Sequence, residues 1–359
     1  MNDSIIRRQS KKVTVGNVEV GAFAPISIQS MTNTDTHDIS ATTEQILRLQ
    51  EAGCDIVRIT LPDTEAVKTV KALKNDPNIK IPVVGDIHFD YKIALAAAEE
   101  GIDKIRINPG NIGSDDRVKA VADCCKRHNI PIRIGVNSGS VEKHILKKYG
   151  SPTPDALCES AMYHASLLEK FDFTDIVISV KASSPLSTIL SYRKLAGMCS
   201  YPLHLGVTEA GGAETGAIKS AVGIGALLSE GIGDTIRVSL TADPVKEIYA
   251  AKNILSSLEL DSRKGLEIVA CPTCGRTKID LISLLQSFEK AVDDNSLRHI
   301  KAKVALMGCV VNGPGEAREA DIGIAGGIGE AVFFKHGKII EKIPEDLIIS
   351  KLVDELKKI

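Results

Sequence analysis

The stretch Val83-Val-Gly-Asp-Ile-His88, followed by the segment Tyr91–Glu100 and then by Lys104-Ile-Arg-Ile-Asn108, decides the fold. The first and third parts are short apolar runs typical of strands, and the middle part has the apolar spacing of an amphipathic helix. Two strands joined by a helix of this length indicate a parallel βαβ unit, because parallel strands need a long crossover connection.

The same alternation runs from residue 25 to about residue 256. The predicted strands are Ile26–Met31, Ile56–Thr60, Val83–His88, Lys104–Asn108, Ile132–Asn137, Ile176–Lys181, Leu203–Thr208 and Thr235–Leu240. The helical patterns between and after them include Thr43–Ala52, Tyr91–Glu100, Asp115–His128, Asp155–Lys170, Ala213–Ser229 and Pro244–Leu255. Eight such units over this length predict an α/β fold of the (β/α)8 TIM-barrel type. A doubly wound open sheet is the alternative, but no G-x-G-x-x-G pattern follows the first strand.

The alternation ends at Ser262-Arg-Lys-Gly265. We therefore expect residues 1–260 to form the barrel domain and residues 261–359 to form a small α/β domain. The second domain contains several Gly-rich turns and ends in an amphipathic helix, Pro344–Lys358.

Composition points to a globular enzyme. The chain has 359 residues, 43% of them hydrophobic and 25% charged, and its formal net charge is −2. Because aromatic residues make up only 4% and Trp is absent, surfaces for stacking on bases are scarce, and we expect no nucleic-acid partner. The N-terminus lacks the apolar core of a signal peptide and no apolar run is long enough to span a membrane, so a cytoplasmic protein is expected.

Three of the eight cysteines stand apart from the others. Five lie in or beside apolar helical stretches and are interpreted as small core residues: Cys54, Cys124, Cys125, Cys158 and Cys199. The remaining three occur in Cys271-Pro-Thr-Cys274 and Gly308-Cys309, shortly before Asn312-Gly-Pro-Gly-Glu316. Cysteines with two residues between them direct both sulfurs to one point, as a metal or an iron–sulfur cluster requires. A third cysteine would leave one ligand position open for chemistry.

Structural zinc is the alternative for these cysteines. A zinc ribbon has a second Cys-x-x-Cys roughly 15–20 residues after the first, but only Cys309 follows here, much further along. His299 is a candidate fourth zinc ligand, although its basic neighbours are typical of a solvated surface.

Polar side chains recur near the ends of the predicted strands. They are Arg58, Asp86, His88, Arg106, Asn108, Arg133, Asn137, Lys181, His204, Thr208, Arg237 and Ser239. The outer faces of barrel strands are covered by helices, where an unpaired arginine would be costly to desolvate. We therefore expect this set to face the carboxyl-terminal mouth of the barrel, where such barrels place their active sites.

The charges in this set are unbalanced. Four arginines and a lysine face only two expected acidic partners, Asp86 and Glu209, so the mouth is predicted to bind an anion. Because the planar guanidinium fork matches phosphate oxygens, a phosphate or diphosphate is the expected ligand. Glu209 itself is either a proton donor or a cap on the turn Gly206-Val-Thr-Glu-Ala-Gly-Gly.

Topology suggests a dimer. The eighth helix returns the chain to the bottom of the barrel, about 20 Å from the mouth judging by strand length. A cluster in the second domain would therefore serve the mouth of a second copy more easily than its own, in a head-to-tail homodimer.

Several motifs together resemble one known family, the 4-hydroxy-3-methylbut-2-enyl diphosphate synthases, in the compact bacterial two-domain form. The motifs occur in family order from about residue 10 to residue 340, and no motif position departs from the pattern. They are Ile28-Gln-Ser-Met-Thr-Asn-Thr34, Val57-Arg-Ile-Thr60, Gly85-Asp-Ile-His88, Arg106-Ile-Asn-Pro-Gly110, Arg133-Ile-Gly-Val-Asn-Ser-Gly-Ser140, Gly206-Val-Thr-Glu-Ala210, Ala270-Cys-Pro-Thr-Cys-Gly-Arg276 and Met307-Gly-Cys-Val-Val-Asn-Gly-Pro-Gly-Glu316.

The resemblance implies the reductive ring opening of 2-C-methyl-D-erythritol 2,4-cyclodiphosphate in the non-mevalonate isoprenoid pathway, with electrons from flavodoxin or ferredoxin. It implies a [4Fe–4S] cluster held by Cys271, Cys274 and Cys309, with Glu316 on the fourth iron. It implies a diphosphate clamp of Arg58, Arg106, Arg133, Lys181 and Arg237, with Asp86, His88, Asn108, Asn137, Thr208 and Ser239 around it. Glu209 would supply a proton, and Asn312 would contact the substrate near the iron.

Two other functions fit parts of the pattern. A phosphate-binding barrel of the pterin-synthase kind would carry out group transfer and use the tail as a zinc module. An iron–sulfur sensor would bind a regulatory phosphate without turnover. The identity of the bound metal separates the first of these from the synthase, and turnover under reducing conditions separates the second.

Overall fold

The computed structural model describes residues 5–261, 265–310 and 319–359. The chain divides into two compact units, Met1–Asp261 and Ser262–Ile359. Each unit has its own hydrophobic core, and each is described by itself.

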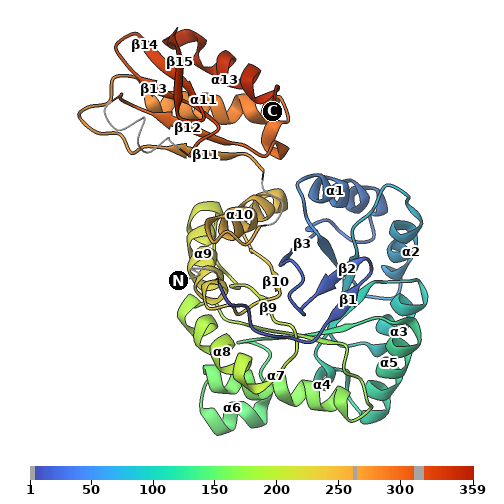
Figure 1. Cartoon of the computed structure of the whole chain (residues 1–359). Helices are drawn as coiled ribbons and strands as arrows, with labels where there is room; N and C mark the ends of the chain where they lie inside the picture. The colour runs from blue at the N-terminus through green and yellow to red at the C-terminus, as the bar shows by residue number, and fades with distance from the viewer. Residues whose placement is uncertain (1–4, 262–264, 311–318) are drawn as a thin grey trace. The chain divides into compact units, whose positions relative to one another are not determined.

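The first unit is a barrel of eight parallel strands, which confirms the predicted fold class (Figure 1). The strands are β3 (Ser27–Met31), β4 (Ile56–Thr60), β5 (Val83–Asp86), β6 (Lys104–Ile107), β7 (Ile132–Asn137), β8 (Ile176–Lys181), β9 (His204–Leu205) and β10 (Thr235–Ile236). They pair in the order β8-β7-β6-β5-β4-β3-β10-β9. A parallel bridge between Ile178 and Leu203 joins the two ends of this sheet, so the barrel closes.

Helices surround the strands (Figure 1). They are α1 (Ile39–Glu51), α2 (Val67–Asn75), α3 (Tyr91–Glu99), α4 (Pro109–Ile112), α5 (Asp115–His128), α6 (Lys143–Tyr149), α7 (Pro154–Glu169), α8 (Pro185–Met198), α9 (Ala213–Ser229) and α10 (Pro244–Ser257). Their apolar faces pack on the outer face of the strands in one continuous core. This covering leaves the barrel interior and its rims as the places for polar side chains.

Several strands are shorter than the sequence predicts, and the difference is largest for β9 and β10. β9 ends at Leu205 and not at Thr208, and β10 ends at Ile236 and not at Leu240. Glu209, one residue beyond the predicted seventh strand, has a φ of 53°, in the left-handed region, so the backbone turns there. The residues after β9 therefore turn into the connection that leads to α9.

An N-terminal hairpin was not predicted from the apolar alternation. β1 (Val13–Val15) and β2 (Val18–Val20) pair in antiparallel fashion. Val15 and Val20 pack against Ile56 and Val84, which lie in the first halves of β4 and β5. The hairpin thus covers the amino-terminal end of the barrel and leaves the carboxyl-terminal rim for function.

The second unit is a five-stranded mixed sheet with helices. Its elements are β11 (Glu267–Ala270), α11 (Leu281–Asp294), η1 (Leu297–His299), β12 (Lys303–Met307), β13 (Ile322–Gly326), β14 (Glu330–Lys335), β15 (Lys338–Pro344), η2 (Glu345–Leu347) and α13 (Ile348–Leu356). β11, β12 and β13 are parallel, and β14 and β15 are antiparallel to their neighbours. The predicted final helix begins at Ile348 and not at Pro344, because residues up to Pro344 pair with β14.

No helix within the described ranges is long and apolar enough to cross a membrane.

Candidate functional site

Asp86 lies at the centre of a buried basic group inside the barrel. It ends β5, and its register partner on β6 is Arg106. Arg106 Nη1 donates to Asp86 Oδ1 across 3.1 Å, and Arg58 Nε lies 3.7 Å from Asp86 Oδ2. Burial raises the pKa of Asp86, but Arg58, Arg106 and Arg133 outweigh it and hold the pKa at about 2. The carboxylate is therefore ionised and bound between arginines.

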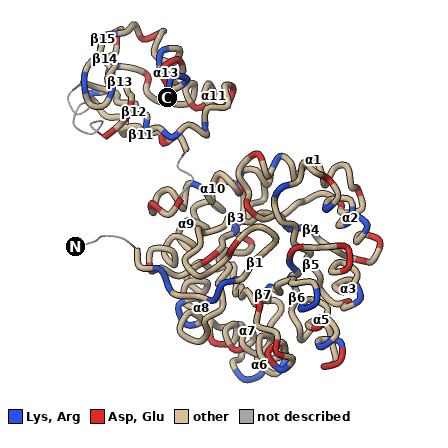
Figure 2. The backbone as a smooth tube through the Cα atoms, turned by 45° about the vertical axis from the view of Figure 1, so that its right-hand side comes forward, with Lys and Arg blue, Asp and Glu red and all other residues tan. Residues whose placement is uncertain are grey.

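Asp86 alone does not balance these cations. Figure 2 marks the Lys and Arg positions of the chain in blue and the Asp and Glu positions in red. Arg133 is 1% exposed, and its Nε and Nη2 have no hydrogen-bond partner among the described residues. Burial, followed by repulsion from Arg58 and Arg106, lowers the pKa of Arg133 well below its usual value. Burial is also the main reason that the pKa of Arg58 falls to about 9. Buried cations without partners are costly, and a bound anion would offset that cost.

Lys181 extends the basic group from β8. Its Nζ lies 3.3 Å from Nε2 of His204, a fully buried residue on β9. Burial and the charges of Arg237, Arg133 and Arg58 lower the pKa of Lys181 well below its usual value. A Cβ on Gly206 would lie 2.5 Å from this Nζ, so the glycine leaves the space that the lysine occupies.

Two members of this group were missed by the sequence analysis. Glu247 on α10 is 5% exposed, and its Oε2 lies 3.9 Å from Arg237 Nε and accepts from Ser30 Oγ at 2.8 Å. It corrects the expectation that only Asp86 and Glu209 are the acidic partners. Helical spacing could have indicated that Glu247 is buried, since it shares a face of α10 with Ile248 and Ala251.

The second missed residue is Lys104, which opens β6. It is fully buried, and its Nζ has no hydrogen-bond partner in the described part of the chain. Because side chains alternate along a strand, its position two residues before Arg106 was the available signal. It adds to the excess of buried positive charge.

The other predicted site residues lie toward the rim and differ in how deeply they are buried. Asn108 is buried, and its Oδ1 accepts from the N–H of Gly135 on β7 at 2.9 Å. Asn137, Thr208 and Ser239 are half-buried, whereas His88 and Glu209 are exposed. Glu209 keeps its left-handed backbone in the connection after β9, a kind of strain that is frequent at functional sites.

Cys271 contacts the turn that carries Cys309, although Gly308 in this turn follows Cys271 by 37 positions in the sequence. Ala270 of β11 and Leu306 of β12 are register partners in parallel strands. Cys271 and Cys309 therefore follow the carboxyl ends of neighbouring strands. The N–H of Gly308 donates to Cys271 Sγ at 3.2 Å, so this sulfur lies against the turn that carries Cys309.

Cys274 lies in the exposed turn after β11. Its N–H donates to Thr277 Oγ1 at 3.1 Å, and the N–H of Lys278 donates to Gly308 O at 2.9 Å, which ties this turn to Cys309's turn. Hydrogen bonds from Arg276 lower the pKa of the Cys274 thiol. A lowered pKa favours the thiolate, the form that binds metals. This donor set fits an iron–sulfur cluster.

Three predicted residues need separate mention. Asn312 and Glu316 lie outside the described residues. His299, the candidate zinc ligand, places its Nδ1 2.7 Å from Ser296 O within its own turn.

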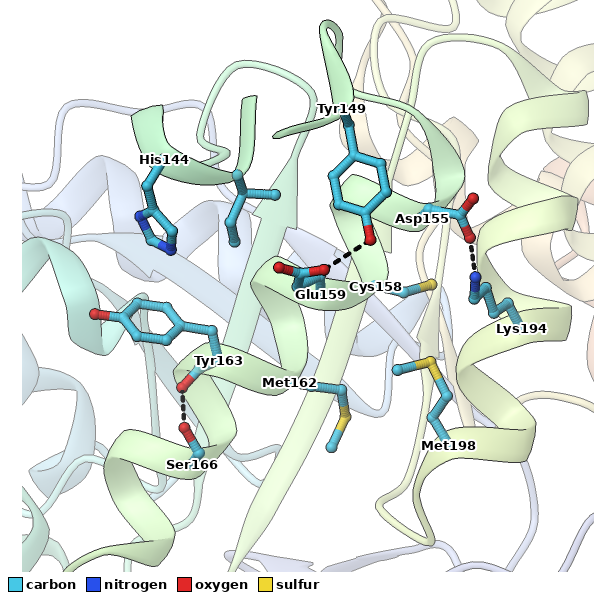
Figure 3. Close-up of a pocket in the computed structure, with 11 residues that line it drawn as sticks. His144, Tyr149, Asp155, Cys158, Glu159, Met162, Tyr163, Ser166, Lys194 and Met198 are labelled. Atoms are coloured by element: carbon cyan, nitrogen blue, oxygen red, sulfur yellow. Dashed lines mark hydrogen bonds and ion pairs between the residues drawn. The ribbon is translucent and has the colours of Figure 1, made fainter. Parts of the chain in front are cut away.

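A separate cavity of about 410 Å³ lies on the outside of the barrel between α6, α7 and α8 (Figure 3). Four of its polar side chains pair with one another. Tyr149 donates to Glu159 at 2.7 Å, and Lys194 forms an ion pair with Asp155. The barrel interior, with its unpartnered cations, remains the stronger candidate for a binding site.

The fold, the basic residues and the cysteines define a class of protein. It is a (β/α)8 barrel with a basic interior, followed by an α/β domain with three cysteines after the carboxyl ends of two neighbouring strands. Residues 10–252 match the GcpE TIM-barrel domain, and residues 267–358 match the GcpE protein C-terminal domain. The chain belongs to the GcpE family.

Relatives match along the whole chain. A protein of Ruminiclostridium cellulolyticum, named 4-hydroxy-3-methylbut-2-en-1-yl diphosphate synthase (flavodoxin), is 56% identical over 356 residues, 99% of both chains. A Clostridium perfringens protein of the same name is 56% identical over 347 residues, 97% of this chain and 98% of its own. Among solved structures, N-acetylneuraminic acid synthetase from Leptospira borgpetersenii has a TM-score of 0.51 and 14% identity, covering 82% of this chain and 99% of its own. This last likeness concerns the fold alone.

Proposed function

We propose that the chain converts 2-C-methyl-D-erythritol 2,4-cyclodiphosphate into 4-hydroxy-3-methylbut-2-enyl diphosphate, as an iron–sulfur oxidoreductase of isoprenoid biosynthesis. Two electrons and a proton open the ring and release water. Membership of the GcpE family supports the proposal, and so do the printed names of relatives at 56% identity. The structural observation that carries it is the buried, unpartnered guanidinium of Arg133 among further cations.

The barrel residues bind and orient the diphosphate. Asp86 holds Arg106 and Arg58, and Arg106 also donates to Gly135 O and Arg58 to Met31 Sδ. The N–H groups that these contacts do not use are left for phosphate oxygens. Arg133 and Lys181 reach from the next strands, and Arg237 is held near Glu247. The diphosphate must leave one carbon while staying attached to another, so several fixed contacts are needed to hold it through the reaction.

Glu209 is the proposed proton donor for loss of the hydroxyl group. It is exposed at the rim in a connection whose backbone is held in the left-handed region. His88, Asn108, Asn137, Thr208 and Ser239 complete the polar surroundings of the substrate.

Cys271, Cys274 and Cys309 would hold three irons of a [4Fe–4S] cluster, with Glu316 on the fourth. A carboxylate is a harder and more exchangeable ligand than a thiolate, so Glu316 would suit the ligand position of the cluster that is not fixed by a cysteine. When bound, the cluster supplies electrons and a Lewis-acidic iron. Asn312 would hydrogen-bond the substrate beside it.

The proposed partners follow from the same reaction. Relatives whose names include flavodoxin support flavodoxin as electron donor, with ferredoxin as the alternative. Because α10 returns the chain to the amino-terminal side of the barrel strands, we propose a head-to-tail homodimer in which one copy's cysteine domain serves the other's mouth. We also propose that the protein works in the cytoplasm.

The test is purification without oxygen, assay of iron and sulfide, and addition of the cyclodiphosphate with a strong one-electron donor. About four irons and four sulfides per chain, with formation of the ring-opened diphosphate, would support the proposal. Bound zinc without product would favour the phosphate-barrel transferase. Cluster and phosphate binding without turnover would favour the sensor.

A further inference from the structure

Two neighbouring connections at the barrel rim are joined by one buried histidine. β6 leads into residues 108–113, which include Asn108 and α4, and β7 leads into residues 138–142. Because β6 and β7 are parallel neighbours, both connections leave the same rim. His164 on α7 is fully buried and contacts both of them.

The two ring nitrogens of His164 face different connections. Nδ1 accepts a hydrogen bond from the N–H of Gly110 at 3.0 Å. Nε2 lies 2.6 Å from Glu142 Oε1, close although poorly aligned for a hydrogen bond. Since Nδ1 is an acceptor, the ring proton is on Nε2 and faces Glu142.

Glu142 also lies near Ser160, a second residue of α7. Burial raises the pKa of Glu142, but the nearby polar groups of His164 and Ser160 outweigh it and lower the pKa. Glu142 stands at the N-cap of α6, yet its side chain makes no capping hydrogen bond. The side chain is turned to His164 and not to its own helix.

Gly110 is required for the close approach on the other side. A Cβ at this position would lie 2.8 Å from His164 Cε1. The backbone angles of Gly110 are not in the left-handed region, so the glycine serves space and not conformation. Beyond it, Asn108 Oδ1 accepts from Gly135 N–H on β7, so the start of the same connection is also fixed to the neighbouring strand.

We propose that His164 is a positioning residue that fixes these two rim connections so that Asn108 and Asn137 meet the substrate. The proposal rests on the proposed function, because it assumes that the rim binds the cyclodiphosphate. His164 does not touch the substrate and acts through Gly110 and Glu142.

Three variants test it in the full chain with its cluster. His164→Leu removes both contacts, and His164→Asn keeps an acceptor near the position of Nδ1. Gly110→Ala leaves the histidine intact and pushes the connection away from it. Gly225→Ala is the matched control, because nothing lies within 4 Å of a Cβ at this helical position.

We expect His164→Leu and Gly110→Ala to raise KM for the cyclodiphosphate and weaken pyrophosphate binding on the order of tenfold, since small displacements of positioning groups are costly. His164→Asn should recover at least half of this loss. Iron content and the electron paramagnetic resonance spectrum of the reduced cluster should not change, and Gly225→Ala should match the wild type.

A lower Tm with unchanged KM and unchanged pyrophosphate affinity in both His164→Leu and Gly110→Ala would overturn the proposal and leave His164 a core residue. If the wild type failed to convert the cyclodiphosphate, the proposed function would fail, but the pyrophosphate series would still decide the role of His164. A wild type that bound no pyrophosphate would overturn both.

Discussion

The backbone N–H of Gly308 donates a hydrogen bond to Sγ of Cys271 across 3.2 Å. The contact results from parallel pairing of β11 with β12, with α11 as the crossover between them. Hydrogen bonds from backbone amides to cysteine sulfur tune the potential of iron–sulfur clusters. The turn that carries one proposed ligand, Cys309, would therefore also tune a cluster bound by the other, Cys271.

Cys271→Ser should abolish the brown absorption and most of the bound iron, because the sulfur at the end of β11 is lost from the proposed ligand set. Iron, sulfide and the visible spectrum of protein purified without oxygen are the measurements. Cys199→Ser is the control, since this half-buried thiol lies in the barrel unit, outside the proposed ligand set, and donates to Leu195 O. Full retention of iron in Cys271→Ser would remove this residue from the ligand set.

Sequence patterns located the elements whose limits are local. β4, β7, β8, α5 and α9 have the predicted bounds because apolar runs and helix-compatible segments end at clear polar or Gly-rich breaks. The strand Lys338–Pro344 depends on pairing with β14, which is not a local property of the sequence.

In the candidate site, too, some residues could be predicted from local sequence patterns and others could not. Alternation along β4 to β8 placed Arg58, Arg106 and Arg133 on one face, and the structure brings them together around Asp86. Glu247 was missed because it reaches the group from a helix, where a carboxylate in the first turn has many ordinary roles. A strand pattern carries no information about which helix side chain fills the space above it.

Glu316→Gln should keep the cluster and lose most turnover, because an amide is a poorer and neutral replacement for the proposed carboxylate ligand. The measurements are iron content and kcat with a strong one-electron donor. Glu319→Gln, an exposed neighbour in sequence, is the control. Unchanged kinetics in Glu316→Gln would contradict the proposed open iron position.

Gly135→Ala should displace Arg106. A Cβ on Gly135 would lie 2.4 Å from Arg106 Nε, and Gly135 O accepts from Arg106 Nη2 at 2.6 Å. We expect KM for the cyclodiphosphate to rise on the order of tenfold with iron content unchanged. Gly225→Ala again serves as control, and an unaltered KM in Gly135→Ala would show that Arg106 has no part in binding.

Arg133→Met should weaken anion binding and at the same time stabilise the free protein. The buried guanidinium has two nitrogens without partners, so replacing it by an apolar chain of similar length removes a desolvation cost of about 1 kcal/mol or more. Pyrophosphate at about 100 times its Kd should stabilise the wild type by about 2.7 kcal/mol, and this gain should be largely lost in the variant. Urea unfolding with and without pyrophosphate measures both effects.

Arg193→Met is the control for this pair of effects, since Arg193 is exposed on α8 and paired with Glu230. It should leave the stabilisation by pyrophosphate unchanged. A destabilised Arg133→Met protein that keeps full stabilisation by pyrophosphate would contradict the assignment of Arg133 to the anion site.

Asp86 should make stability depend on pH in the acid range. Its pKa is about 2 in the folded protein and 3.8 ordinarily, so the carboxylate contributes about 2 kcal/mol of stability above pH 4. Because the folded pKa is the lower one, this contribution is lost as the pH falls from about 4 to about 2. Wild type and Asp86→Asn should therefore differ in unfolding free energy at pH 6 and converge near pH 2, whereas Asp354→Asn, on the exposed face of α13, should follow the wild type throughout. A constant difference between wild type and Asp86→Asn across this range would mean that the arginines do not hold the carboxylate in its charged form.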